Sequence, residues 1–284
     1  MRFLDLFPAM GPGLAGDPGL IGPDTMVWDI SREFLVVLGG PAALMLQVAH
    51  PLVAAGVAEH SNFAEDPLKR LLGTLDAVLV IVFGDTDQAH AMAAHVAAMH
   101  RPVHGRLTAD VGSFKADCPY SAFDPELALW VFATLVEMAL EIYHRFIRRI
   151  TPHQRESYYQ QMRPFAAQFG IQDAMLPPTY AAFQAYFRRM CREQLAVGPA
   201  AWQISGSVFE AWVLGLPVTP AGQLLAGYLL PTIMAAAYDL PHGRPSRMLM
   251  GTLAWLSRRL VPLLPRRWRY WPHYHTAKRR LANT

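Results

Sequence analysis

Two long stretches of this chain contain no Asp, Glu, Lys or Arg: residues 34–58 and residues 211–237. Hydrophobic residues make up 52% of the 284 residues and charged residues only 17%, so the chain can form a large buried core. Glycines, prolines and polar residues such as Gln47, His50 and Gln223 interrupt both stretches. A membrane-spanning helix needs about 20 continuous apolar residues. We therefore interpret both stretches as buried core helices and predict no transmembrane segment.

Signals for helix starts recur along the chain. A capping residue followed by proline, which is favoured at the first helical position, occurs at Asp66-Pro67, Asp124-Pro125 and Thr151-Pro152. Further helices are predicted over residues 86–101, 178–195 and 244–260. Sustained alternation of apolar and polar residues, which would indicate strands, is absent from the sequence. The pattern predicts an all-α fold, built as a single-domain multi-helix bundle.

The ends of the chain differ from its middle. Residues 1–25 are rich in glycine and proline, and we expect an N-terminal arm that wraps around the domain formed by residues 26–274. Residues 275–284 are expected to form a loose basic tail. A basic segment is often a solvated face, and it can also touch phosphates or a membrane surface. Because no nucleic-acid-reading motif accompanies it, we predict no nucleic-acid partner, and weak membrane-surface contact stays open.

The cysteines and the N-terminus bear on location. Cys118 and Cys191 form no CxxC pair, which argues against a disulfide framework or a cysteine-ligated zinc site. Asp5 and Pro8 interrupt the N-terminal segment, so a signal peptide is not predicted. These features favour a cytoplasmic location.

Common catalytic motifs are missing. The sequence contains no GxSxG, P-loop, HExxH or strand-linked GxGxxG motif. Glu137 and Glu141 lie one helical turn apart, and we interpret them as one face of a helix rather than as the acid and base of a glycosidase.

Histidines and one arginine are the remaining candidates. Six of the eleven histidines lie between His50 and His104. His100 and His104 are four residues apart, but Pro102 argues against a continuous helix through both. Arg70 and Thr74 share one face of an apolar helix. Such an arginine either reaches water or an acidic neighbour, or meets a bound anion in a cavity, and the residues alone leave both readings open.

Seven motifs occur in an order that carries a family resemblance. The chain resembles MpaB-type oxygenases and latex-clearing rubber oxygenases, and is most similar to the bacterial MpaB-like branch. The resemblance extends from about Gly22 to the basic residues 278–280. The motifs are GPDTMVWDISRE, GGPAALMLQVAHPLVAAGVAEHSNF, DPLKRLLGT, VFGD, MHRPVHG, YSAFDPELALWVFATLVE and RESYYQQMRPFAAQFG.

The resemblance implies a function and a cofactor. It implies a globin-like all-α core, with residues 26–274 as the catalytic domain, and a haem b whose iron has one axial histidine. Known members cleave carbon–carbon double bonds of isoprenoids with dioxygen. The family's arginine and threonine beside the haem match Arg70 and Thr74. The axial histidine matches His100, followed by Gly105, with His104 as the alternative ligand.

Other residues receive roles from the same resemblance. Glu59 and His60 would act as a catalytic base or as a neighbouring group that orients a ligand. Gly73 stands where the rubber enzymes have a lysine, so the distal side of the iron would be open or water-bound. Phe132 stands where many relatives have a histidine.

These departures shape the expected substrate. Without the lysine or a secretion signal, polyisoprene is not expected, and an apolar small molecule such as an isoprenoid, lipid or aromatic metabolite is. Two alternatives to an oxygenase stay open at this point. One is a haem-binding carrier or sensor without turnover, and the other is a binder of apolar ligands that has lost haem.

Overall fold

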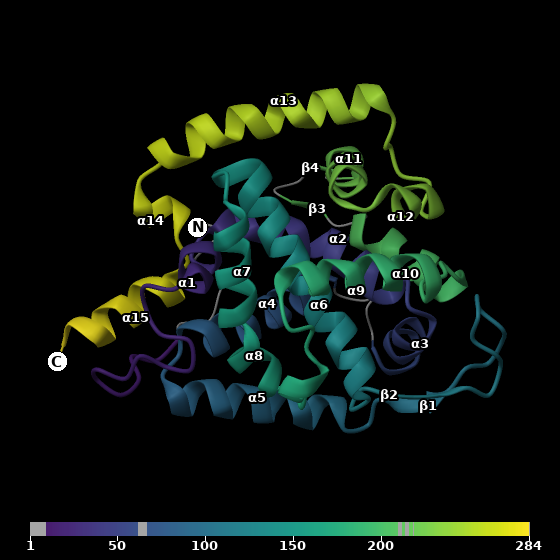
Figure 1. Ribbon diagram of the computed structural model, residues 1–284, viewed down its shortest axis with the longest axis horizontal. Coiled ribbons are helices and arrows are strands. Elements are labelled where there is room, and N and C mark those ends of the chain that lie inside the picture. The colour runs from purple at the N-terminus through teal and green to yellow at the C-terminus, as the bar shows by residue number, and fades with distance from the viewer. Residues whose placement is uncertain (1–9, 62–66, 210–211, 214–215, 218, 284) are drawn as a thin grey trace.

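The structure, a computed structural model, describes residues 10–61, 67–209, 212–213, 216–217 and 219–283. The side chains of residues 67–71, 209, 212–213 and 216–217 lie outside this description. The described part is mostly helical, with two short antiparallel two-stranded sheets. The predicted all-α class is therefore confirmed, and Figure 1 shows the helices packed around α2 and α6.

Helices follow one another along the chain, with two short β-hairpins between them. The first half of the chain forms α1 (Met26–Ser31), η2 (Phe34–Gly39), α2 (Gly40–Val48), α3 (Pro51–His60), α4 (Pro67–Phe83), α5 (Thr86–His100), β1 (His104–Arg106), β2 (Pro119–Ser121), α6 (Pro125–Ile142) and the π-helix η3 (Tyr143–Ile147). The second half forms α7 (Pro152–Gln161), α8 (Arg163–Ala167), η4 (Asp173–Met175), α9 (Tyr180–Glu193), α10 (Pro199–Phe209), β3 (Trp212–Val213), β4 (Leu216–Pro217), α11 (Thr219–Leu229), α12 (Thr232–Ala237), α13 (Arg244–Leu260), η5 (Val261–Leu263), α14 (Arg266–Arg269) and α15 (Pro272–Ala282).

The first charge-free stretch forms a bent pair of core helices. The segment Phe34–Val48 and helix α3 meet at an angle of 106°, and Pro51 starts α3 because proline suits the first helical turn. Leu46, Val48 and Ala49 are completely buried. This stretch is therefore part of the core, as predicted. In the second stretch, the described residues Ala226, Leu229, Met234 and Ala235 are also buried.

Helix α6 is the central helix of the bundle. Asp124 caps it by accepting a hydrogen bond from the backbone N–H of Glu126 at 2.9 Å. Trp130 on α6 donates to the carbonyl of Leu46 at 3.0 Å, which ties α6 to α2. The segment Pro125–Ile147 is long and apolar enough to cross a membrane, and 61% of an apolar 18-residue stretch within it is buried inside the protein. A buried core helix satisfies the same criterion of length and composition.

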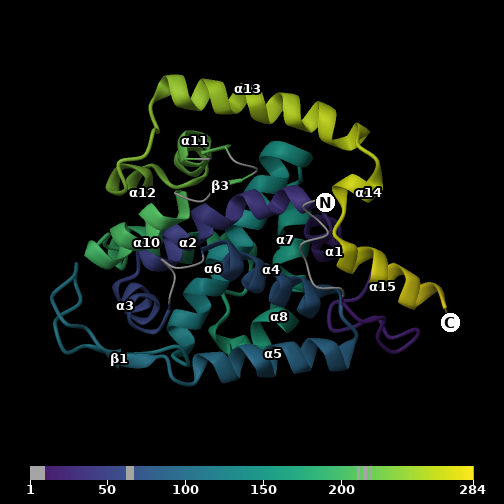
Figure 2. The same ribbon diagram turned by 180° about the vertical axis from the view of Figure 1, so that it is seen from behind.

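The two ends of the described chain are packed together. The Arg280 side chain is buried, and its guanidinium donates to the carbonyls of Asp17 and Phe83, both at 2.9 Å. The N–H of Gly16 donates to the carbonyl of Arg280 at 3.1 Å. Residues 272–282 form helix α15, beside α1 and the N-terminal segment in both views (Figures 1 and 2). The segment expected to be a loose tail is therefore helical and packed, because buried Arg280 bonds to the carbonyls of Asp17 and Phe83.

Helices α4 and α5 form a hairpin near the predicted site. Only Gly84 and Asp85 separate them, so the two helices run antiparallel. Asp85 caps α5 in a capping box with Gln88, which fixes the start of the helix. The predicted end of the apolar run at Phe83 is confirmed, whereas the predicted cap residue Asp66 lies outside the described residues.

Candidate functional site

Three predicted site residues meet where α3 ends. The Tyr120 hydroxyl, on β2, donates a hydrogen bond to Oε2 of Glu59 and lies 3.4 Å from Nε2 of His60. The same imidazole nitrogen of His60 donates to the backbone carbonyl of His104, on β1, at 3.2 Å. The structure thus brings Glu59, His60 and His104 together around Tyr120. The sequence did not single out Tyr120, whose role depends on a strand pairing.

Two glycines make room for the Tyr120 ring. In the hairpin, Gly105 pairs with Tyr120, and a Cβ on Gly105 would lie 2.5 Å from the Tyr120 hydroxyl oxygen. A Cβ on Gly56 of α3 would lie 3.3 Å from Cγ1 of Val103 and 3.6 Å from the Tyr120 ring. Glycine is therefore required at position 105 for close approach. Burial, and then the hydrogen bond to Glu59, raises the pKa of Tyr120 above its ordinary value.

His100 and His104 lie on different elements. Helix α5 ends at His100, whose carbonyl accepts from the N–H of Val103 at 2.9 Å, and His104 starts β1. This confirms that no regular helix continues through Pro102. Both imidazoles are exposed, so either could bind a ligand from outside the core.

The predicted pair on α4 is described only in part. Thr74 is exposed, and the side chain of Arg70 lies outside the described residues. A Cβ placed on neighbouring Gly73 would meet nothing within 4 Å. No described residue therefore fills the space beside Gly73, and no contact between described residues joins Thr74 to the Glu59 cluster.

The residues present suit the donor chemistry of haem. A haem iron takes one or two ligands from the protein, and histidine imidazole is a common one. The exposed imidazoles of His100 and His104 are of this kind. None of the described residues occupies the space beside Gly73 of α4. Among the described residues, no group of three or more His, Cys, Asp or Glu gathers as a multidentate metal site.

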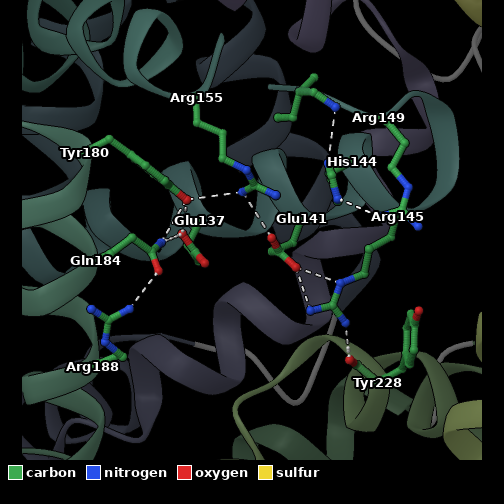
Figure 3. A network of polar contacts seen from close by, with 11 residues as sticks. Glu137, Glu141, His144, Arg145, Arg149, Arg155, Tyr180, Gln184, Arg188 and Tyr228 are labelled. Carbon is green, nitrogen blue, oxygen red and sulfur yellow. Dashed lines mark hydrogen bonds and ion pairs between the residues drawn. The ribbon is translucent and has the colours of Figure 1, made fainter. Parts of the chain in front are cut away.

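A second polar cluster surrounds two glutamates of α6 (Figure 3). Oε2 of Glu137 accepts from the Gln184 side-chain amide at 2.5 Å and from the Tyr180 hydroxyl at 3.2 Å. Glu141 is held by two arginines: Arg145 at 2.5 Å from Oε2 and Arg155 at 3.1 Å from Oε1. These glutamates therefore lie on an interior face of α6, paired with α7 and α9. The spacing had indicated a helix face without indicating that it is buried.

The same cluster borders a cavity of about 330 Å³. Its wall includes Glu137, Glu141, Arg188, Phe187, Leu229 and Arg247. Burial, and then the charge of Glu141, raises the pKa of Glu137 to about 7. Oε1 of Glu137 receives no hydrogen bond from the described residues and points away from Tyr180 and Gln184 (Figure 3). A carboxyl in this position can gain or lose a proton near neutral pH.

Sequence reasoning missed this cluster because its signal was weak. The sequence showed only two glutamates four residues apart in an otherwise apolar helix, with Arg145 one turn after the second. The partners Gln184 and Tyr180 come from a helix about 40 residues away.

A shallow hollow of about 370 Å³ beside α4 and α5 includes Asp76 and His95. Neither hollow is lined by a predicted site residue whose side chain the structure describes.

Comparison with known proteins identifies the family. A family model described as the catalytic domain of ER-bound oxygenase mpaB/B′ and rubber oxygenase matches residues 28–263. Two relatives, from Mycobacterium bovis and Mycobacterium tuberculosis, are each 25% identical over 234 residues, covering 78% of this chain and 89% of the relative. Both are described as uncharacterized proteins. No solved structure matches the chain. The chain belongs to the family of mpaB-type and rubber oxygenase catalytic domains.

Proposed function

We propose that this protein is a haem b-dependent oxygenase that uses dioxygen to oxidise an apolar small molecule, by cleavage of a carbon–carbon double bond. The observation that carries the proposal is the convergence of Glu59, His60 and His104 from α3 and β1. His104 is 44 residues from His60 in sequence, and the chain belongs to a family of oxygenases. A carboxylate and an imidazole held together next to the backbone of the alternative iron ligand suit acid–base chemistry beside a cofactor.

The overall reaction needs no other reductant. Both oxygen atoms of dioxygen end on the two alkene carbons, the C=C bond breaks, and two carbonyl groups form. Haem, when bound, supplies the iron that activates dioxygen. The apolar composition of the chain favours an isoprenoid, lipid or aromatic substrate.

The chain's own residues would have distinct roles. His100 would hold the haem iron, with His104 as the alternative, and Arg70 would bind a haem propionate. Thr74 would donate a hydrogen bond to a bound ligand. Glu59 would accept or return a proton, since the Tyr120 hydroxyl holds its carboxylate in one orientation. His60 would orient the cluster through its bond to the His104 carbonyl.

Haem retention tests the cofactor. Purified protein should bind one haem per chain and show a Soret absorption band. His100→Ala should abolish haem retention, and His104→Ala should preserve it; the reverse result would make His104 the ligand. His90→Ala serves as the control, because His90 is also an exposed histidine of α5. Protein that stays colourless through a haem titration would contradict the proposal.

Turnover separates the enzyme from a carrier. Haem-loaded protein should consume dioxygen in the presence of small alkenes and release carbonyl products. Glu59→Gln should reduce turnover while leaving the Soret band unchanged, because the carboxylate would accept or return a proton and would not bind the iron. Haem binding without oxygen consumption over a panel of isoprenoid, fatty and aromatic alkenes would favour a carrier or sensor.

A further inference from the structure

Helix α13 lies along the outer edge of the molecule and packs through one side only (Figures 1 and 2). Met250, Ala254 and Val261 are buried against the protein, and their spacing places them on one helical face. Between them, the Ser257 hydroxyl donates to the carbonyl of Phe146 at 2.7 Å. The inward side of α13 therefore packs against the rest of the protein.

The side chains that α13, η5 and α14 leave exposed are also largely apolar, and we call this surface the outer face. On α13, positions 249, 253, 256 and 260 repeat at helical spacing and form a row about a quarter turn around the helix from the buried row. Its nine large apolar side chains are between 42% and 78% exposed: Met248, Leu249, Leu253, Trp255, Leu256, Leu260, Leu263, Leu264 and Trp268. Single exposed apolar residues are ordinary on protein surfaces, but nine of them along one short stretch of chain mark an interaction site.

Positive charge is interleaved with the outer face. The guanidinium of Arg259 lies 5.4 Å from the ring centroid of Trp255, and that of Arg267 lies 5.8 Å from Trp268. Residues 240–284 contain ten Lys and Arg and no Asp or Glu. Exposed basic side chains of this segment are Arg244, Arg247, Arg259, Arg266, Arg267, Lys278 and Arg279.

We propose that the outer face docks on the surface of an anionic lipid bilayer, with α13 parallel to the membrane plane. An amphipathic helix with Leu and Trp on one side and flanking arginines binds in this way. Tryptophan favours the boundary between lipid and water, and each Lys or Arg near an anionic surface adds to the attraction. The apolar side chains would enter the headgroup region while Arg259, Arg266 and Arg267 contact lipid phosphates.

Charge decides between a membrane and a second copy of the chain. Two copies meeting through the outer face would bring their arginines together without any acidic residue from residues 240–284 to neutralise them. Like charges across an interface oppose association. An anionic bilayer supplies both the apolar phase and the opposite charge. The proposal does not depend on haem, so its test can fail or succeed separately from the proposed oxygenase.

Vesicle sedimentation of the full chain tests the proposal. Vesicles of phosphatidylcholine with phosphatidylglycerol should sediment the protein, and vesicles of phosphatidylcholine alone should do so at least about tenfold more weakly. High salt should weaken binding to the anionic vesicles, because it screens the arginines. Equal binding to both vesicle types, or binding to neither, would overturn the proposal.

Variants locate the contact. Leu253→Ser with Leu256→Ser should reduce anionic-vesicle binding by about tenfold or more, as should Arg259→Gln with Arg266→Gln and Arg267→Gln. The matched control is Phe123→Ser, since Phe123 is 57% exposed and lies before α6, outside the outer face. Unchanged circular dichroism melting would verify the fold of each variant. If the leucine variant instead converts a wild-type oligomer to monomer and leaves vesicle binding unchanged, the face serves a second copy.

Discussion

The Tyr120 hydroxyl donates a hydrogen bond to the carboxylate of Glu59, which is 61 residues earlier in the chain. The bond exists because β2 pairs with β1 at Gly105 and because α3 crosses the hairpin at Gly56. It fixes the orientation of an exposed carboxylate beside His60. The candidate site thus depends on a small hairpin as much as on the helices.

Gly105→Ala should disturb this hydrogen bond. The added Cβ would lie 2.5 Å from the Tyr120 hydroxyl oxygen, so the ring must move away from Glu59. We expect a loss of about 1–3 kcal/mol in the free energy of unfolding, measured by urea denaturation. Gly73→Ala is the control, because its Cβ would meet nothing within 4 Å and alanine favours a helix. An equal loss in both variants would contradict the steric explanation.

Glu137→Gln should stabilise the protein at high pH. Folding raises the pKa of Glu137 from 4.5 to about 7, so the folded state holds this proton more tightly than the unfolded state. Below pH 4.5 the Glu137 carboxyl does not lower the free energy of unfolding. As the pH rises through 7 it lowers that free energy by up to about 3 kcal/mol. The variant should therefore match wild type in acid and exceed it by up to that amount at about pH 8. A stability difference that is constant with pH would argue against this account.

His50→Leu should change the pH dependence of stability in the sense opposite to Glu137→Gln. Burial lowers the pKa of His50 from 6.5 to about 4, against the opposing charge of Asp124. The unfolded state then binds the proton first, and about 3 kcal/mol of stability is lost as the pH falls from 6.5 to 4. In wild type this loss offsets the gain from Glu137 over nearly the same range.

The two variants separate these opposing contributions. Without His50, stability should fall as the pH rises from about 4.5 to 7; without the Glu137 carboxyl, stability should rise with pH from about 4 to 6.5. Urea midpoints measured across this range would check both slopes. Identical pH profiles in the two variants would rule out these assignments.

Arg269→Ala should be strongly destabilising. Glu33 is completely buried, and the guanidinium of Arg269 donates to both of its carboxylate oxygens, at 2.5 and 2.6 Å. Removing the arginine leaves a buried carboxylate without its partner, at a cost of about 3–5 kcal/mol. Thermal unfolding would measure the loss. Lys115→Ala is the control, because the Lys115–Asp110 pair is exposed and its loss should not shift the melting curve.

Much of the fold could be predicted from the sequence. Proline after a capping residue located the starts of α6 and α7, and the apolar stretch from residue 34 to 58 proved to be core. These features are local, because caps and helical periodicity act within a few residues. The order of motifs also predicted the family before any geometry was known.

Tertiary structure decided the rest. Burial of Arg280 turned an expected loose tail into packed helix α15, and helix α9 turned the Glu137 face inward. Strand pairing, not spacing, joined Tyr120 to Glu59. Local sequence determines which segments become helical and which faces are apolar. Which face meets a neighbour, and which polar side chain then needs a partner, depends on contacts between residues far apart in the chain.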